Sequence, residues 1–473
     1  MVFITLKSSV LRFSLSACAQ LTMHIGKSRG LRHLKIHSGD HFMTEGERLS
    51  YIGKLQLFGR DAKLYITISF LITFSWGISG VIFNLYLQEA GRMEDFIGFF
   101  LSISMFASAG IAFIAGIMTD RASRKKIILI ANIVTFGVLV VQYTTLDPVG
   151  LLVSQVFLGI SVAFRDVALS PYVSDISTDQ ERAHLFAVGG GVSLLGVFAG
   201  SLVGGIMPQI FVDWLSFSPT QSFVIPYRYT LWLSLIPTAF AILLITQMTT
   251  DTPTPSNDRL AIRNVKNWGF IGKYTLTIAS VGLGAGMIVM FFNLFFTHEF
   301  PIDSQIVGLI FGANTLILSA GNFLAPALAD KIGKVRTVVL TEALSVPFLL
   351  TLAYADTLQL AIIGYVTRNV LMNMAGPISN AFFMEGLTKE ERATAVGVVR
   401  SADSFVRAIA AIIGGWLLAL GLYRLPYVLV SGLYVLGITL FYGFFRNKER
   451  DIEWRKEVSL SLEEEPESAI DVT

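Results

Sequence analysis

The sequence is dominated by apolar runs of about 20 residues, the length that a helix needs to cross roughly 30 Å of hydrocarbon. Backbone polar groups in lipid must be satisfied within the spanning segment, so runs of this length are predicted to be helices. The chain is therefore predicted to be an all-α membrane protein with twelve transmembrane helices. The predicted spans are residues 64–88, 96–118, 127–146, 149–172, 184–207, 228–248, 272–296, 305–328, 336–355, 358–383, 395–420 and 426–445.

Composition agrees with a membrane protein and excludes several other classes. Hydrophobic residues make up 53% of the 473 residues and charged residues only 15%, whereas soluble domains have about 25% charged residues. Cys18 is the only cysteine, so no intrachain disulfide can form. The chain has no G-x-x-x-x-G-K-[ST] loop, which argues against ATP-driven transport. We expect no enzyme activity, catalytic residue, cofactor or metal, and no nucleic-acid partner.

Cations mark one side of the membrane, because they gather in the connections that follow even-numbered spans. The opposite connections carry only Arg92, Arg228 and Arg424. By the positive-inside rule, both termini are expected to face the cytoplasm. The cations of the first set are Arg121, Arg124, Lys125, Lys126, Arg182, Arg259, Arg263, Lys266, Lys273, Lys331, Lys334, Arg336, Lys389 and Arg392.

Short motifs recur along the chain at an offset of 209 to 210 residues. FNLYL at 83–87 returns as FNLFF at 292–296, and ERA at 181–183 returns at 391–393. Parallel repeats of this kind build one large group of secondary transporters, with the substrate site between the halves near the middle of the bilayer. The predicted parts are a leader at 1–63, six-helix bundles at 64–248 and 272–445, a cytoplasmic linker at 249–271 and a tail at 446–473.

The charged connection between spans 2 and 3 resembles the loop signature of the major facilitator superfamily, G-x-x-x-D-R-x-G-R-K/R. Ser123 stands where that family usually has glycine. The second copy, between spans 8 and 9, places Pro326 at the leading glycine. The matching residues are Gly116, Asp120, Arg121, Arg124 and Lys125 in the first copy and Asp330, Lys331, Gly333, Lys334 and Arg336 in the second.

Two further motifs connect the chain to this family, with departures. Residues 196–205, GVFAGSLVGG, resemble the antiporter signature of helix 5, with Ser201 in place of its proline. In helix 4 the family usually has arginine four residues before a glycine, whereas here Gln155 precedes Gly159. In its motifs the chain is most similar to the twelve-helix drug/proton antiporter-like efflux branch.

The resemblance implies that the duplicated loop is part of a cytoplasmic gate. Asp120 would contact the start of helix 11, where Arg400 is a plausible partner, and Asp330 would contact the start of helix 5. Asp175 and Glu385, at the ends of helices 4 and 10, would accept hydrogen bonds from the loop cations. Such contacts would hold the two halves together on the cytoplasmic face.

Charged and amide side chains within the spans are candidates for substrate binding. The resemblance implies that helices 1, 4, 7 and 10 line the cavity, where Arg165 and Arg368 could bind an anion, although either could instead be satisfied internally. Asp166 need not pair with Arg165, since adjacent helical residues point about 100° apart. Asn84 and Asn293, near the outer ends of helices 1 and 7, could bind substrate or bridge helices.

Proton coupling would use Asp166 or Asp403, because the predicted spans contain no histidine and we place His298 in an external loop. Arg400, Asp403 and Arg407 are spaced as a ladder on one helix face, and Asp403 and Arg407 could form a structural pair or take part in coupling. Residues 1–42 suggest a misassigned start or a dispensable leader, with Met43 as a normal cytoplasmic start, and the acidic tail is expected to be disordered.

We therefore expect a monomeric secondary transporter that exports small organic solutes by alternating access, coupled to protons. Its partners would be a small-molecule substrate, the lipid bilayer and protons, and its location a prokaryotic plasma membrane. One alternative is uptake of an organic anion. Another is a non-transporting sensor or lipid scramblase on the same scaffold.

Overall fold

The structure, a computed structural model, describes residues 58–215, 222–249 and 265–449. Residues 1–57 and 250–264 and most of the predicted tail lie outside the described residues, as do the side chain of Asp120 and those of a few other helical residues. The described chain is almost entirely helical. The helices are α3 Arg60–Glu89, α4 Glu94–Arg121, α5 Arg124–Thr144, α6 Pro148–Asp175, α7 Asp179–Leu215, α8 Val224–Gln247, α9 Trp268–Ile288, η2 Val289–Phe291, α10 Phe292–Glu299, α11 Ser304–Ile332, α12 Lys334–Tyr354, α13 Leu358–Met374, α14 Gly376–Glu385, α15 Lys389–Ala419 and α16 Leu425–Phe445.

Helices occur at every predicted span, and within the described residues 11 are long and apolar enough to cross a membrane. The predicted tenth span differs, because residues 358–383 form two helices, α13 and α14, that meet at Ala375. Pro377 follows this break at the start of α14, where its missing N–H and fixed φ suit the first turn of a new helix. The predicted seventh span is also interrupted, since the 3₁₀ turn η2 separates α9 from α10.

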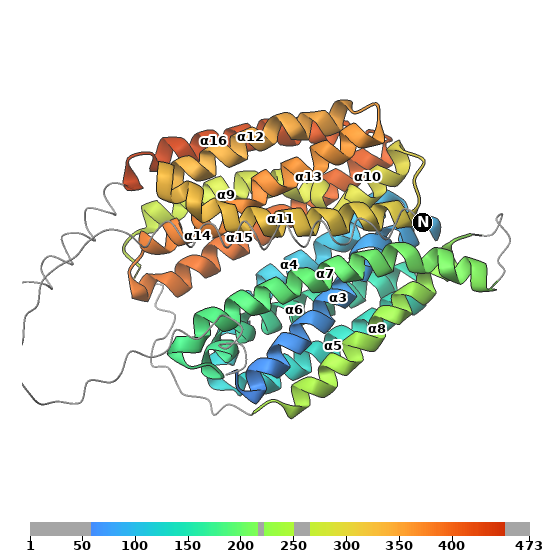
Figure 1. Cartoon of the computed structure of the whole chain (residues 1–473), viewed down its shortest axis with the longest axis horizontal. Helices are drawn as coiled ribbons and strands as arrows, with labels where there is room; N and C mark the ends of the chain where they lie inside the picture. Colours follow the sequence, from blue (N-terminus) through green and yellow to red (C-terminus); the bar gives the residue numbers. More distant parts are fainter. Residues whose placement is uncertain (1–57, 216–221, 250–264, 450–473) are drawn as a thin grey trace, which may run out of the picture. The chain divides into compact units, whose positions relative to one another are not determined.

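Helices α3–α8 form the first half of the molecule and α9–α16 the second, drawn from blue to green and from yellow to red in Figure 1. We call the end of the helices nearest Thr249 and Val265 the linker end, and the opposite end the far end. One hydrophobic core contains residues of both halves, including Tyr86, Phe100 and Phe295. Two other cores each belong to one half: the first half has one around Tyr172, and the second half has a separate one around several aromatic residues. The aromatic residues of the latter are Tyr274, Phe382, Phe383, Phe441 and Phe445.

Glycines allow the halves to touch at the far end. A Cβ built on Gly98 of α4 would lie 2.4 Å from the backbone oxygen of Ala411 on α15. A Cβ on Gly308 of α11 would lie 2.5 Å from the backbone oxygen of Ser201 on α7. Neither position has room for a larger residue, so the α4–α15 and α7–α11 crossings depend on direct backbone contact.

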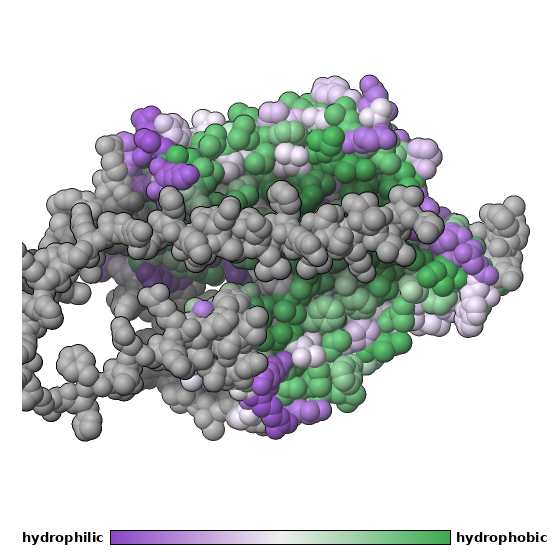
Figure 2. Space-filling model, in the orientation of Figure 1, coloured by the Kyte–Doolittle hydropathy of each residue, from purple (hydrophilic) through white to green (hydrophobic). Residues whose placement is uncertain are grey.

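The outer surface of the helices is apolar, as expected for contact with lipid. On the face shown in Figure 2, hydrophobic side chains form a band over both halves, with hydrophilic residues gathered toward the helix ends. Large apolar side chains such as Ile236 and Leu243 of α8 are exposed at 64% and 58%. In water such exposure would be costly, whereas in a bilayer it stabilises the protein.

Candidate functional site

A cavity of about 320 Å³ lies mainly within the first half of the molecule. Helices α3, α5 and α6 supply most of its lining, and Val289, Met290, Asn293 and Phe311 are the contribution of the second half. The surface is mostly apolar, with amide and hydroxyl side chains at intervals. Such a composition is typical of a binding site for a small organic molecule.

Helix α6 presents one stripe of residues to this cavity. Gln155, Leu158 and Arg165 all line it, at spacings of three and seven residues that bring side chains to one face of a helix. Gly159, one turn after Gln155, holds α6 against α4, since a Cβ there would lie 2.2 Å from the backbone oxygen of Ser104. This close crossing buries Gln155, which is only 2% exposed.

Arg165 contributes the one full charge among the described lining residues, and that charge is compensated. Its Nε and Nη2 donate to Oδ1 of Asp166 at 3.2 and 3.1 Å. The guanidinium also lies over the ring of Trp76, 6.0 Å from its centre. Adjacent helical residues do pair here, because the long arginine side chain can bend back toward the neighbouring carboxylate.

Most other polar groups of the cavity have partners within the protein. Ser79 and Tyr143 share a hydrogen bond of 2.7 Å, and the amide of Gln142 donates to Ser154 at 3.1 Å. Two buried lining atoms have no partner among the described residues: Oε1 of Gln155, an acceptor, and Nη1 of Arg165, a donor. Both atoms are buried, and both belong to side chains of α6 that line the cavity.

Arg368 lies apart from this cavity. It is 1% exposed and packs against aromatic rings, with its guanidinium 5.3 Å from the ring centre of Tyr434 and 5.8 Å from that of Phe292. It donates to the hydroxyl of Tyr434, while its Nε has no partner among the described residues. The structure thus does not bring Arg165 and Arg368 together, because the aromatic side chains of the second half enclose the latter.

Asn84 and Asn293 bridge the two halves in a reciprocal way, and both also line the cavity. Nδ2 of Asn84 donates to the backbone oxygen of Met290 at 2.6 Å, and Nδ2 of Asn293 donates to the backbone oxygen of Val81 at 3.0 Å. Donors and acceptors are related by the same 209-residue offset as the sequence repeats. We call these four groups the asparagine clasp.

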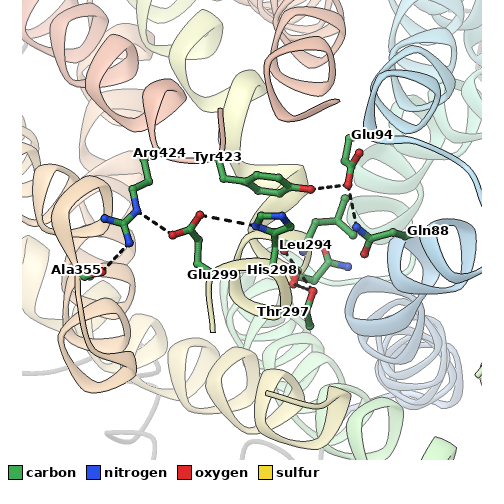
Figure 3. A network of polar contacts seen from close by, with 10 residues as sticks. Gln88, Glu94, Leu294, Thr297, His298, Glu299, Ala355, Tyr423 and Arg424 are labelled. Carbon is green, nitrogen blue, oxygen red and sulfur yellow. Dashed lines mark hydrogen bonds and ion pairs between the residues drawn. The ribbon is translucent and has the colours of Figure 1, made fainter. Parts of the chain in front are cut away.

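A polar network at the far end also joins the halves (Figure 3). The hydroxyl of Tyr423 donates to Glu94 of α4, which also accepts from Gln88 at 2.8 Å. Burial, with the neighbouring Glu94 carboxylate, raises the pKa of the Tyr423 hydroxyl well above its usual value, so Tyr423 remains a donor at physiological pH. The ring of His298 stacks on Tyr423 at 3.6 Å.

His298 was expected in a loop, and that prediction was wrong: it lies in the short helix α10. The turn η2 ends α9 and allows a new helix to carry His298 and Glu299 toward the loop after α15. There Arg424 donates to Glu299 at 2.8 Å. The break in the predicted seventh span therefore places charged residues at the far end.

Asp403 and Arg407 form an ion pair on α15, with 2.8 Å between Oδ2 and Nε. The other carboxylate oxygen of Asp403 is buried without a partner among the described residues. It lies against Gly282 of α9, where a Cβ would come within 2.2 Å of it. Arg400, expected in the same ladder, is exposed and does not join the pair.

The duplicated loops make equivalent ion pairs at the linker end. Arg124 pairs with Asp175 in the first half, and Lys334 pairs with Glu385 at 2.6 Å in the second. Both contacts between a loop cation and the end of helix 4 or 10 were expected from the sequence. In addition, Lys125 donates to the backbone oxygen of Thr246 at 2.9 Å.

Of the contacts expected between the halves at the linker end, the one predicted for Asp330 is not made by any described residue. Asp330 is exposed and makes no hydrogen bond or ion pair with a described residue, as is also true of Arg400. The side chain of Asp120 lies outside the described residues, so its pairing with Arg400 remains a prediction. Of the other motif residues, Arg121, Lys331 and Arg336 are exposed and Gly116 is half-buried.

The two loop copies use different turns, which explains the serine in the first. Gly333 has a φ of +90°, a region that favours glycine. Ser123, its counterpart, has a φ of −59° and caps α5 by accepting from the backbone N–H of Lys126. A glycine is therefore required only in the second copy, where Glu449 also accepts from the backbone N–H groups of Lys334 and Val335.

Glu391 is a residue whose role the sequence did not reveal. It accepts from the backbone N–H groups of Lys266 and Asn267 at 2.7 and 3.0 Å, just before α9. Burial alone would raise the pKa of this carboxylate, but hydrogen bonds from Lys266, Thr388 and Asn267 outweigh it and lower the pKa. Glu391 thus anchors the start of the second half to the first turn of α15.

The glycines of the helix 5 motif have a packing role. Cβ atoms built on Gly196, Gly200 and Gly204 would each come within 3 Å of α3. Gly205 faces α11 instead, beside the hydroxyl of Ser304, which donates to its backbone oxygen at 3.1 Å. The motif thus places α7 between α3 and α11.

Comparisons with known proteins agree with this architecture. The agnestins efflux protein of Paecilomyces divaricatus is 22% identical over 397 residues, which cover 81% of this chain and 84% of that protein. The solved nucleoside transporter NupG matches with a TM-score of 0.65 at 15% identity, covering 82% of this chain and 99% of that one. A bacterial homologue of the human lysosomal transporter Spinster, in an inward-facing and occupied conformation, matches with a TM-score of 0.66 at 14% identity, covering 80% and 95%.

The curated relative is fungal, so it gives no support to the expected prokaryotic plasma membrane. The profile of the Major Facilitator Superfamily matches residues 65–296 and 274–464, most of the chain. Together with the duplicated bundles and the shared far-end core, this match identifies the chain as a multi-pass membrane protein of the Major Facilitator Superfamily, a family of membrane transporters.

Proposed function

We propose that the protein carries small organic solutes across the membrane by alternating access, with the cavity of the first half as its binding site. The observation that carries this proposal is the distribution of the hydrophobic cores. The halves share one core toward the far end and have separate cores toward the linker end. This arrangement is what a two-state carrier needs, since one end can separate while the other is closed.

The linker end is the cytoplasmic end if the positive-inside rule holds, and the conformation is then inward-facing. The asparagine clasp and the Tyr423–Glu94 hydrogen bond close the far end. In the opposite state, the duplicated loops would close the linker end. Asp120 with Arg400, and Asp330 with the start of α7, are the proposed contacts.

Proton-coupled efflux is the transport mode that we propose. The name of the efflux protein from Paecilomyces divaricatus favours export. The carboxylates able to carry the proton are Asp166, paired with the cavity arginine, and Asp403, paired with Arg407. Each can exchange its arginine partner for a proton when the halves move, which would link protonation to conformation. Uptake of an organic anion is less well supported, because the charge of Arg165 is compensated.

Cysteine labelling tests alternating access without knowledge of the substrate. In a Cys18→Ser background, Val289→Cys places a thiol beside the cavity. We expect a membrane-impermeant thiol reagent to label it from the linker end, and we expect the labelling rate to change when some members of a panel of organic solutes are added. Labelling only from the far end, in membranes of known orientation, would contradict the proposed state. Ile236→Cys, at an exposed position of α8 outside the lining of the cavity, is the control.

Proteoliposomes with a trapped pH-sensitive dye test the coupling. A panel of organic solutes should contain compounds whose addition moves protons through the wild type. Asp166→Asn or Asp403→Asn should abolish this proton movement and leave solute exchange. If both variants still move protons, neither carboxylate is the coupling site.

A further inference from the structure

The cavity contains a specific pattern of unmet hydrogen bonds that bears on the class of solute. This inference rests on the proposed function, because it assumes that the cavity is the transport site. The two groups involved are the carbonyl oxygen of the Gln155 side chain and Nη1 of Arg165. A buried polar group without a partner costs about 1–3 kcal/mol, so a ligand that satisfies one is strongly preferred over a ligand that does not.

The charge of the cavity argues against an ionic solute. Arg165 is the one lining residue of the described chain with a full charge, and Asp166 holds two of its three guanidinium nitrogens. In this conformation, with Asp166 paired to Arg165, a carboxylate or phosphate would meet a cation that is already neutralised. A cationic solute would meet no carboxylate among the described lining residues. An uncharged solute avoids both costs.

The spacing of the two groups sets the shape of the solute. Gln155 and Arg165 are ten residues apart on α6, a rise of about 15 Å along the helix axis. Between them the lining is apolar, with Leu158 on the same stripe and Phe83 and Leu139 on the facing helices. A flat solute shorter than this rise can still reach both groups, because the glutamine and arginine side chains are long.

We propose that the site takes an uncharged, flat organic molecule that has a hydrogen-bond donor at one end and an acceptor at the other. The donor would bind Oε1 of Gln155, and the acceptor would bind Nη1 of Arg165. Both atoms are buried in this conformation, so the two side chains would turn toward the solute when it binds. The apolar side chains between them would contact the ring faces. Gln155 is then a specificity-determining residue, at a position where the family usually has a cation.

Three coumarins serve as matched probes, because they share the rings and the carbonyl acceptor. Umbelliferone adds a phenolic hydroxyl donor, herniarin masks that hydroxyl as a methyl ether, and coumarin lacks it. Binding to the full-length protein in nanodiscs would be measured by calorimetry at mildly acidic pH, where the phenol stays protonated. We expect umbelliferone to bind roughly tenfold more tightly than coumarin, the value of one satisfied hydrogen bond of about 1.4 kcal/mol, and herniarin to resemble coumarin.

The variants separate a contact with Gln155 from a general effect on the cavity. Gln155→Leu should remove the preference for umbelliferone, and Gln155→Glu, which keeps an acceptor, should retain it. Gln142→Leu, a second lining glutamine whose amide donates to Ser154, should change the three affinities alike and leave their ratio. Arg165→Met should weaken all three probes, since each has the carbonyl.

Several results would overturn the inference. They are an umbelliferone preference that survives Gln155→Leu, tighter binding of a coumarin carboxylate than of umbelliferone, and no binding of any probe. These failures differ from failure of the proposed function. If other solutes still change the labelling rate at Val289→Cys while the three coumarins bind with equal affinity, the proposed solute class is wrong and the carrier mechanism stands.

Discussion

The two halves of the molecule share sequence motifs at an offset of 209 to 210 residues, yet they differ where the membrane is crossed. In the first half α3 and α6 are continuous helices of 30 and 28 residues, and a cavity opens between them. In the second half the corresponding spans are broken, at η2 and at Ala375. Aromatic side chains fill the equivalent space and enclose Arg368.

This difference indicates that the two halves have different roles in transport. Continuous helices give fixed positions to hydrogen-bonding groups, as a binding site needs. Broken helices have fewer backbone hydrogen bonds at the break and can bend there. We infer that the first half recognises the solute, and that the second half, with Asp403 against α9, undergoes the larger internal change.

The largest effect is expected from filling the space that Asp403 occupies. Gly282→Val should displace its carboxylate and cost about 1–3 kcal/mol, which corresponds to a roughly 5- to 150-fold loss of gradient-driven transport in proteoliposomes. Gly272→Ala on the same helix, with nothing within 4 Å of its Cβ, should be neutral. Normal coupling in Gly282→Val would mean that Asp403 needs no fixed position.

The two arginines provide a sharper comparison. Arg368→Met should leave the melting temperature unchanged or raised, because an apolar side chain of similar size can replace a buried charge. Transport should nevertheless fall about tenfold if the second half needs that charge in its other state. Arg165→Met should reduce solute affinity with little change in melting temperature. A large drop in the melting temperature of Arg368→Met would show that the guanidinium holds the aromatic cluster together.

The asparagine clasp should respond symmetrically to substitution. Asn84→Ala and Asn293→Ala each remove hydrogen bonds of about 1 kcal/mol, so each should shift the equilibrium roughly fivefold toward an open far end. Spin labels across the far end would report the populations. A larger shift for Asn293→Ala than for Asn84→Ala would mean that the second half, with its broken helix, contributes more to closing the far end than the first.

The smallest effect concerns Glu391. Its pKa is lowered in the folded protein, so its contribution to stability is complete above the unfolded value near 4.3 and is lost as the pH falls through the folded value. Hydrogen exchange at the amides of Lys266 and Asn267 should therefore speed up in acid. Glu391→Gln should remove this acid dependence, and Glu181→Gln, its repeat counterpart, should not alter it.

Most of the fold follows from hydropathy and repetition, because lipid permits few alternatives to helices. The breaks at η2 and Ala375 were not predicted, since an apolar run has the same composition whether it bends or not. Pro377 was a signal for the second break, but Pro171 is a comparable signal inside the continuous α6. The pairs Arg124–Asp175 and Lys334–Glu385 could be predicted because each lies between neighbouring charged loops.

The candidate site was less predictable for a physical reason. The sequence placed Arg165 and Arg368 in one cavity only because they lie in predicted helices 4 and 10. The depth of each side chain in the membrane and the rotation of each helix about its axis depend on packing between helices, which the sequence of one helix does not determine. Gln155 was visible as a departure from a family motif, but its unpartnered oxygen depends on the crossing at Gly159. The reciprocity of Asn84 and Asn293 was present in the repeat offset, although the accepting carbonyls could only be found in three dimensions.

The asparagine clasp requires only one kind of half. Each half supplies one amide donor and, three residues earlier, one carbonyl acceptor, so the contact is unchanged when the halves exchange places. Two identical copies of an ancestral half could have closed on each other through the same four groups, as in any two-fold dimer. On this view the asparagine clasp first joined two separate copies of the ancestral half, and it was retained when the two copies were fused into one chain.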